Sequence, residues 1–182
     1  MDRFSWLLVF ALSGLIFAVW LTEVEELLLL RLGDPAPQFP LTEQDGTVLD
    51  LPNVRFPKNI VIFFYPKDFS PGCTQEACAY RDAFDRISRY DAILIGVSGD
   101  NRDSHLEFSS AYRLSYSLVS DSGGSIGQKY GVRWLGGVLP YLKRVSYVID
   151  KGGIIRGVFW HEFGVNQHID DVLGCLAGID PK

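Results

Sequence analysis

One stretch decides the fold: Asn59-Ile-Val-Ile-Phe-Phe-Tyr65-Pro66-Lys-Asp-Phe-Ser70-Pro-Gly-Cys73-Thr-Gln-Glu-Ala-Cys78. Its first part, from Ile60 to Tyr65, is a continuous run of β-branched and aromatic residues, which is typical of a strand buried on both faces. Apolar residues with helical spacing follow between Cys73 and Arg89. Cys73 therefore falls where a strand passes into a helix, and the free N–H groups of a first helical turn stabilise a thiolate. The stretch predicts a reactive cysteine at the start of a helix.

The residues downstream predict a continued alternation of strands and helices. Ala92 to Val97 is a second buried apolar run, so the first helix joins two strands in a βαβ unit. Further elements are expected as helices at 102–114, 125–130 and 165–176 and as strands at 116–120, 145–149 and 154–160, the last two joined by a turn at 150–153. This order predicts an α/β three-layer sandwich of the thioredoxin type, with a central mixed sheet flanked by helices.

The N-terminal part has a different composition. Phe4 to Leu21 contains 18 residues without a charge, just long enough to span a bilayer. Because no good cleavage site follows, we expect an uncleaved hydrophobic helix that anchors the protein to a membrane in a bacterial-type cell. A cleaved signal, a helix buried in a partner and a helix folded back on the domain remain alternatives. The side of the membrane stays open. Gly33 to Pro37 marks the start of the folded domain, which divides the chain into 1–32 and 33–182.

Length, net charge and the numbers of cysteines and histidines exclude several classes of function. A length of 182 residues fits one domain. The net charge is −5 and no Lys/Arg cluster is longer than Lys143-Arg144, which excludes nucleic acid as an expected partner. Three cysteines argue against a structural disulfide framework and favour redox use. His105, His161 and His168 lack metal-ligand spacing, so we expect solvated or capping histidines and no metal or cofactor. Cys175 lies in an apolar helical stripe and is expected in the core.

Together these motifs resemble the peroxiredoxins, in particular the peroxiredoxin Q, or bacterioferritin comigratory protein, branch. The resemblance covers residues 33–182 and leaves the first 32 residues outside it. It is carried by Gly33-Asp-Pro-Ala-Pro37, Phe63-Phe-Tyr-Pro-Lys67, Pro66-x-x-x-Ser70-Pro-Gly-Cys73, Cys73-Thr-Gln-Glu-Ala-Cys78, Arg81-Asp82, Ser120-Asp121, Tyr130-Gly-Val132, Arg144-Val-Ser-Tyr-Val-Ile-Asp150 and His168. It implies a thiol-dependent peroxidase that reduces hydrogen peroxide and organic hydroperoxides.

The resemblance also implies roles for single residues. Cys73 would be the peroxidatic nucleophile, which attacks a peroxide oxygen and becomes a sulfenic acid. Pro66 would shield the thiolate and Ser70, where the family most often has threonine, would hydrogen-bond the peroxide. Arg144 would hold both the thiolate and the developing oxyanion, a role that suits a permanently charged group with several donors.

Cys78 would be the resolving cysteine, which forms an intramolecular disulfide with Cys73. Thioredoxin or a similar dithiol would reduce this disulfide, and the protein would work as a monomer. On an intact helix the Cα atoms of residues five apart are separated by roughly 8 to 9 Å. Disulfides usually require less than about 7 Å. We therefore expect the first helical turns to unwind before the disulfide forms.

Two other functions remain as alternatives. A membrane-tethered thiol–disulfide oxidoreductase would carry C-x-x-C at the helix start, whereas this chain has C-x-x-x-x-C. A copper-chaperone-like metal-delivery module would combine the cysteines with His161 or His168, but it usually has C-x-x-x-C.

Two points about the stretch before residue 145 also stay open. Lys143 could point inward in place of Arg144. The apolar loop from Trp134 to Tyr141 could form a wall of the active site, although we expect it to cover the core.

Overall fold

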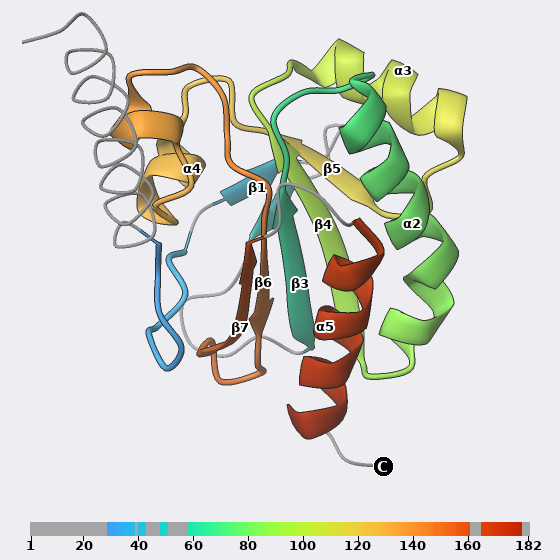
Figure 1. The fold of residues 1–182 in the computed structure, drawn as a ribbon, viewed down its shortest axis with the longest axis vertical. Coiled ribbons are helices and arrows are strands. Elements are labelled where there is room, and N and C mark those ends of the chain that lie inside the picture. Colours follow the sequence, from blue (N-terminus) through green and yellow to red (C-terminus); the bar gives the residue numbers. More distant parts are fainter. Residues whose placement is uncertain (1–28, 39, 43–47, 51–57, 161–164, 180–182) are drawn as a thin grey trace, which may run out of the picture.

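The computed structural model describes residues 29–38, 40–42, 48–50, 58–160 and 165–179. Its centre is a five-stranded sheet in the order β5-β4-β3-β6-β7 (Figure 1). The strands are β3 (Asn59–Phe64), β4 (Ala92–Ser98), β5 (Ser117–Ser120), β6 (Val145–Ile149) and β7 (Ile155–Trp160). β3, β4 and β5 run parallel, whereas β6 is antiparallel to both β3 and β7. A separate antiparallel pair joins β1 (Pro40–Thr42) to β2 (Val48–Asp50).

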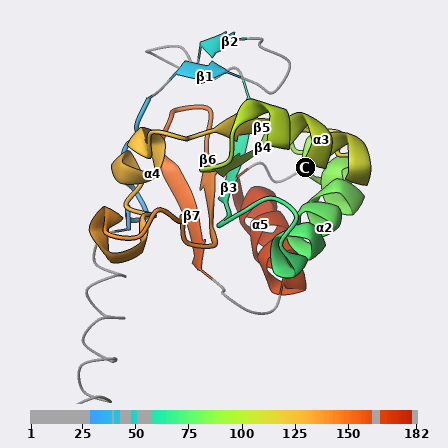
Figure 2. The ribbon, with the colours of Figure 1, turned by 90° about the horizontal axis from the view of Figure 1, so that it is seen from above.

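Helices cover both faces of the sheet, as the view from above shows (Figure 2). The helices are α2 (Pro71–Ser88), α3 (Arg102–Tyr112), α4 (Ser125–Lys129), the 3-10 turn η1 (Trp134–Gly137) and α5 (Val165–Ile179). α2, α3 and α5 lie on one side of the sheet, and α4 lies on the other. The expected α/β sandwich with a mixed sheet flanked by helices is confirmed, and each element expected between residues 60 and 176 is present with bounds that differ by a few residues.

Two apolar clusters form the core, one on each face of the sheet. The central strand β3 contributes to both because successive side chains of a strand point to opposite faces. Ile60, Ile62 and Phe64 pack toward the face that carries α4, whereas Val61 and Phe63 pack under α2 and α5. All six residues of β3 are buried. The continuous apolar run in the sequence reflects this double burial.

The sheet topology brings three distant segments to one edge. β3 and β4 are parallel, so the segments that follow them leave the sheet at the same edge. β6 is antiparallel to β3 and pairs Val145 with Phe64, so the residues just before β6 lie at this edge too. The loop at 65–70, the loop at 99–101 and residues 143–144 therefore meet there.

The segment before β1 runs along the sheet. The amide of Gly33 donates to the carbonyl of Ile155 at 2.9 Å, and that of Ala36 donates to Gly153 at 2.8 Å. Leu29 already belongs to the core cluster. The division into 1–32 and 33–182 stays a prediction, and the expected hydrophobic helix at Phe4 to Leu21 lies outside the described residues.

Candidate active site

Cys73 occupies the first turn of α2. Ser70 precedes the helix in an extended conformation and its carbonyl accepts the amide of Thr74 at 2.8 Å, while Pro71 begins the helix. Proline suits this position because its missing N–H would have no helical partner. The side chain of Cys73 is 1 % exposed. The predicted cysteine at a helix start is thus present, and it faces the sheet.

Arg144 is the group that meets the thiol. Its Nη2 donates to Cys73 Sγ at 3.4 Å, and its Nη1 donates to the carboxylate of Glu76. Burial disfavours the charged guanidinium, but the charges of Glu76 and Cys73 outweigh this, and the pKa of Arg144 is raised above its usual value. Gly72 leaves room for the arginine, since a Cβ there would lie 3.2 Å from Nη2. A permanent positive charge therefore lies against the buried sulfur.

Lys143 and Arg144 are both buried, on opposite faces of the sheet. Successive residues of an extended chain alternate in direction. Arg144 points toward α2, whereas Lys143 Nζ lies 5.3 Å from the ring centre of Trp160. Arg144, and not Lys143, is therefore the basic residue that contacts the thiol of Cys73, a point that the sequence had left open.

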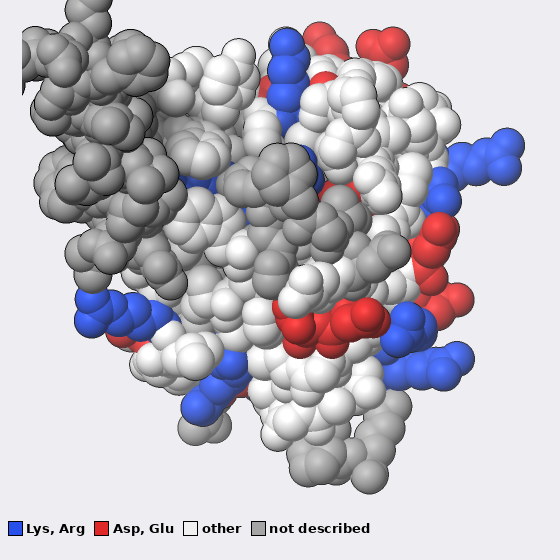
Figure 3. All heavy atoms as spheres, viewed as in Figure 1, with Lys and Arg blue, Asp and Glu red and all other residues white. Residues whose placement is uncertain are grey.

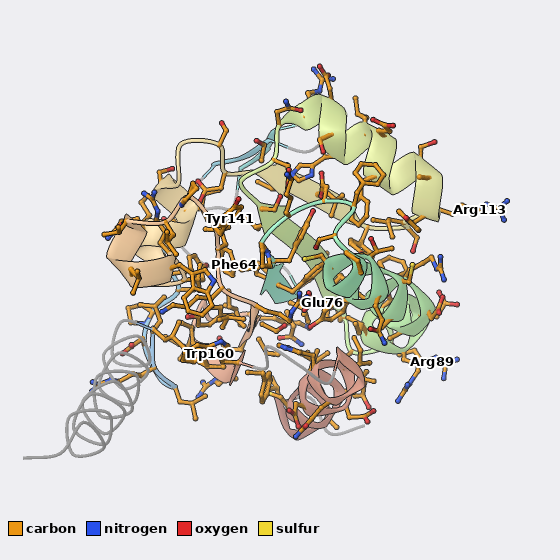
Figure 4. The ribbon with its side chains drawn as sticks, turned by 45° about the horizontal axis from the view of Figure 1, so that its top comes forward. Phe64, Glu76, Arg89, Arg113, Tyr141 and Trp160 are labelled. Carbon is orange, nitrogen blue, oxygen red and sulfur yellow. The ribbon has the colours of Figure 1, made fainter. Side chains whose placement is uncertain are left out.

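Glu76 is a site residue that sequence reasoning missed. It is fully buried and lies on the inner face of α2, whereas Arg89 and Arg113 project away from the protein (Figure 4). The sequence carried a signal, because residues three apart on a helix share a face and Glu76 follows Cys73 at that spacing. One guanidinium therefore binds both the thiol and the carboxylate, and this fixes its orientation.

A second buried network lies one turn further along α2. The hydroxyl of Tyr80 is 2.7 Å from Ser146 Oγ, which is 3.1 Å from His168 Nδ1. His168 is fully buried, so the expectation of a solvated or capping residue is wrong for it. The same expectation is wrong for His105, and His161 lies outside the described residues. Each of the two buried rings has a polar partner at Nδ1, which is Ser146 for His168 and Asp68 for His105.

Pro66 and Ser70 lie on the loop between β3 and α2, and both are partly buried. The hydroxyl of Ser70 donates to the carbonyl of Lys67 at 3.1 Å. Because a hydroxyl has one proton, Ser70 Oγ in this arrangement can only accept a further hydrogen bond. The structure thus brings Cys73 and Arg144 into contact, and it places Pro66 and Ser70 on the loop that leads to Cys73.

Asp68, on the same loop, is the centre of a buried hydrogen-bond cluster. Its carboxylate accepts from Tyr65, Ser104 and His105, at 2.8, 2.7 and 2.8 Å. Burial raises the pKa of Asp68, but the hydrogen bonds with His105, Ser104 and Tyr65 outweigh it and hold the pKa below its usual value. The loop is therefore fastened to α3 through an ionised side chain.

Cys78 lies on α2 five residues beyond Cys73 and is partly buried. It lines an open groove of about 570 Å³ between α2 and α5, together with Gln75, Ala79, Asp82, Ala83, Arg86, Ile169 and Asp170. All three cysteines are free thiols. Cys73 and Cys78 belong to one continuous helix, so the structure corresponds to a reduced, fully folded state.

Cys175 is only partly buried. Its Sγ donates to the carbonyl of Arg156 at 3.3 Å and packs beside the apolar cluster under α5. Burial raises the pKa of this thiol, although Arg156 opposes the shift. Cys175 therefore lies at the edge of the core rather than within it as the helical stripe had predicted, and its raised pKa makes it poorly suited to nucleophilic chemistry.

The loop before β6 differs from expectation. Leu135, Val138, Leu139 and Tyr141 are exposed, with Val138 79 % accessible, so the prediction that this loop covers the core is wrong for its central part. Leu135, Gly136 and Gly137 all have positive φ in this part of the loop.

Lysine and arginine side chains are interspersed with aspartate and glutamate on the face seen in Figure 3. Within the described residues, no group of three or more His, Cys, Asp and Glu side chains is arranged to hold a metal ion. His168, invoked for a metal-delivery module, has Nδ1 bound to Ser146 instead.

The fold and the arginine-bound cysteine define a class of thiol enzymes. The model of the AhpC/TSA family matches residues 32–158, and the chain belongs to this family. Family membership makes the protein a thiol-dependent peroxidase with a thioredoxin-like fold, acting on peroxide with a thiol reductant.

Within that family the relatives point to the peroxiredoxin Q branch. A protein of Populus jackii named "Peroxiredoxin Q, chloroplastic" is 39 % identical, over 81 % of this chain and 68 % of its own length. The crystal structure of peroxidoxin BcpB from Mycobacterium tuberculosis has a TM-score of 0.73 and 33 % identity, covering 82 % of this chain and 98 % of that one. A structure of the Xanthomonas campestris bacterioferritin comigratory protein has a TM-score of 0.70 and 25 % identity, covering 81 % and 99 %.

The expected membrane-associated localisation is wrong. The relatives from Populus jackii, Gentiana triflora and Arabidopsis thaliana are named as chloroplastic proteins. In the part of the chain that the structure describes, no helix is long and apolar enough to cross a bilayer. The segment on which that expectation rested, Phe4 to Leu21, lies outside these residues. α2, the longest described helix with 18 residues, is not apolar enough because its outer face carries Asp82, Asp85 and Arg86.

Proposed function

We propose that Cys73 is the peroxidatic cysteine of this peroxidase. Its thiolate attacks one oxygen of the peroxide, the O–O bond breaks, and Cys73 becomes a sulfenic acid while water or an alcohol leaves with the proton. The observation that carries the proposal is the 3.4 Å contact between Arg144 Nη2 and Cys73 Sγ in a buried site. A guanidinium held there stabilises the thiolate before attack and the leaving oxyanion during it.

Pro66 and Ser70 complete the site in this proposal. Pro66 limits access of water to the sulfur, and Ser70 binds the incoming peroxide. Because the Ser70 proton is already donated to Lys67, the peroxide O–H donates and Ser70 Oγ accepts. The substrates are hydrogen peroxide and organic hydroperoxides. The printed title of the Xanthomonas campestris structure, which names alkyl peroxide reduction activity for that protein, supports the second class.

Cys78 is the resolving cysteine in the proposed cycle. Its thiol attacks the sulfenic sulfur of Cys73, a disulfide forms and water leaves, and a thioredoxin-type dithiol then reduces the disulfide. Both cysteines lie on α2, and Cys78 faces an open groove that a reductant can approach. The monomeric state also stays a prediction.

Peroxide consumption by the full chain with a thioredoxin system tests the assignment. We expect Cys73→Ser to abolish turnover and Cys78→Ser to allow one oxidation of Cys73 without recycling. Cys175→Ser is the matched control, since its thiol is bound to a backbone carbonyl away from the site, and it should leave turnover unchanged. Full turnover in Cys73→Ser would overturn the proposal.

A further inference from the structure

The loop that carries Pro66 and Ser70 is held in an unfavourable conformation. Phe69, between them, has φ of 59°, in the left-handed region. A bulky side chain is rarely found there, and such a conformation persists only where the surroundings enforce it. The ring of Phe69 is 43 % exposed and packs on Phe108 and Tyr112. Stronger contacts than this partly exposed packing must hold the loop.

Those contacts converge on the residue before Phe69. The side chain of Asp68 is buried and receives the three hydrogen bonds from Tyr65, Ser104 and His105 described above. Ser104 and His105 belong to the first turn of α3, whose start is fixed because Asn101 accepts the amide of Ser104 at 2.9 Å. The carboxylate of Asp68 is thus anchored to a rigid element.

The backbone of the loop is anchored through one peptide group. The amide of Asp68 donates to Oδ2 of Asp100 at 2.8 Å. On the other side of the same planar peptide, the carbonyl of Lys67 accepts the hydroxyl of Ser70 at 3.1 Å. Rotation of this plane would move both hydrogen bonds together. Asp100 is held in turn by Ser98, whose hydroxyl donates to Oδ2 at 2.8 Å.

We propose that Asp68 and Asp100 are positioning residues for the peroxidase reaction, which fix the peptide between Lys67 and Asp68 and so orient the hydroxyl of Ser70. Neither carboxylate takes part in the chemistry, and both act through Ser70. Asp68 lies on the loop that follows β3 and Asp100 lies just beyond β4, so the two parallel strands bring both residues to the same end of the sheet. The inference rests on the proposed role of Ser70.

A double-mutant cycle tests whether Asp100 acts on the reaction through Ser70. The measured quantity is the second-order rate constant for oxidation of Cys73 by hydrogen peroxide, in the full chain carrying Cys78→Ser so that only this step occurs. We expect Asp100→Ala to lower it by about tenfold, because a small misplacement of a positioning group is costly. In a chain that also carries Ser70→Ala, Asp100→Ala should lower this rate constant by less than about twofold. The reason is that Asp100 and Ser70 contribute to the same hydrogen bond with the peroxide, which Ser70→Ala has already removed.

Three further measurements separate positioning from folding. Asp100→Asn keeps an acceptor oxygen and should restore most of the rate constant. Alkylation of Cys73 by iodoacetamide, which does not need Ser70, should change by less than about twofold in Asp100→Ala. Asp103→Asn, an exposed change in the first turn of α3, should leave both rates unchanged.

The inference is overturned if Asp100→Ala costs the same factor with and without Ser70, or if alkylation falls as much as oxidation. It is also overturned if Ser70→Ala alone has no effect, whereas the role of Cys73 would then still stand on Cys73→Ser. If the Asp100→Ala variant does not fold, Asp68→Asn takes its place in the double-mutant cycle with Ser70→Ala, and the same criteria apply.

Discussion

Arg144 and Cys73 are 71 residues apart in sequence, and Arg144 Nη2 lies 3.4 Å from Cys73 Sγ. The contact joins the start of a β-strand to the first turn of a helix. Glu76 receives the other end of the guanidinium, so the arginine is held from the same helix that carries the thiol. The charge that the chemistry needs is therefore locked in place before substrate arrives.

Replacing Arg144 by lysine should slow peroxide reduction strongly. A lysine keeps the charge but cannot bind Glu76 and Cys73 in the forked geometry of a guanidinium. We expect kcat/KM for hydrogen peroxide to fall by about a hundredfold, in line with the loss of a charge-stabilising donor. Arg89→Lys, at the exposed residue that caps the C-terminus of α2, is the control and should leave kcat/KM unchanged. An unaltered rate in Arg144→Lys would remove the arginine from the mechanism.

Gly72→Ala should raise the free energy of unfolding while it lowers the rate of peroxide reduction. Alanine favours a helix over glycine by up to about 1 kcal/mol, which raises the free energy of unfolding. Its Cβ, however, would lie 3.2 Å from Arg144 Nη2 and push the guanidinium away from the sulfur, so the peroxide rate constant should drop. Gly174→Ala on α5 meets no atom within 4 Å and should stabilise without loss of activity. Equal activity in both variants would contradict the close approach at Gly72.

Glu76→Gln should destabilise the fold. Removing one charge of a buried pair leaves the other without compensation, which costs about 3 kcal/mol in typical cases. Urea unfolding followed by far-ultraviolet circular dichroism measures the change. The matched control is Glu107→Gln on α3, where the side chain is exposed, and it should shift the unfolding free energy by less than about 0.5 kcal/mol.

Oxidation should unwind the start of α2. Cys73 and Cys78 share one intact helix in the reduced state, and its geometry keeps their Cα atoms too far apart for a disulfide. Amide hydrogen exchange at residues 73–80 should therefore rise after one equivalent of peroxide. The Cys78→Ser variant, which cannot form the disulfide, should keep its protection. Equal protection in oxidised and reduced wild-type protein would show that the helix need not open.

Acid should weaken the loop that Asp68 anchors. Hydrogen bonds hold the pKa of Asp68 below its usual value in the folded state despite burial. A group with a depressed folded pKa stabilises the protein above its unfolded pKa, about 3.9 for aspartate, and this contribution disappears as pH falls through the folded pKa. Unfolding free energies from pH 6 down to acid should therefore fall less steeply in Asp68→Asn than in wild type. Parallel curves would exclude Asp68 as a source of the pH dependence.

Local patterns predicted most of the fold and the position of Cys73 at a helix start, whereas the proposed role of Cys78 came from the family resemblance. The helix predicted from Cys73 to Arg89 is observed as Pro71–Ser88, and the strand predicted from Ile60 to Tyr65 as Asn59–Phe64. The prediction of solvated or capping histidines was wrong for His105 and His168, because their partners lie far away in the sequence. His105 is buried against Asp68 and His168 against Ser146, partners 37 and 22 residues away, and no spacing rule along the chain reveals such pairs.

The sequence by itself determined the elements and the location of Cys73, because helix starts and doubly buried strands follow from neighbouring residues. Only the tertiary structure decided that Arg144 rather than Lys143 meets the thiol, since that depends on the antiparallel register of β6 against β3 and on which face each side chain takes. The pairing with Glu76 and the anchoring of Ser70 through Asp68 and Asp100 were likewise decided there. These contacts join residues from different elements, and chain packing alone brings them within hydrogen-bond distance.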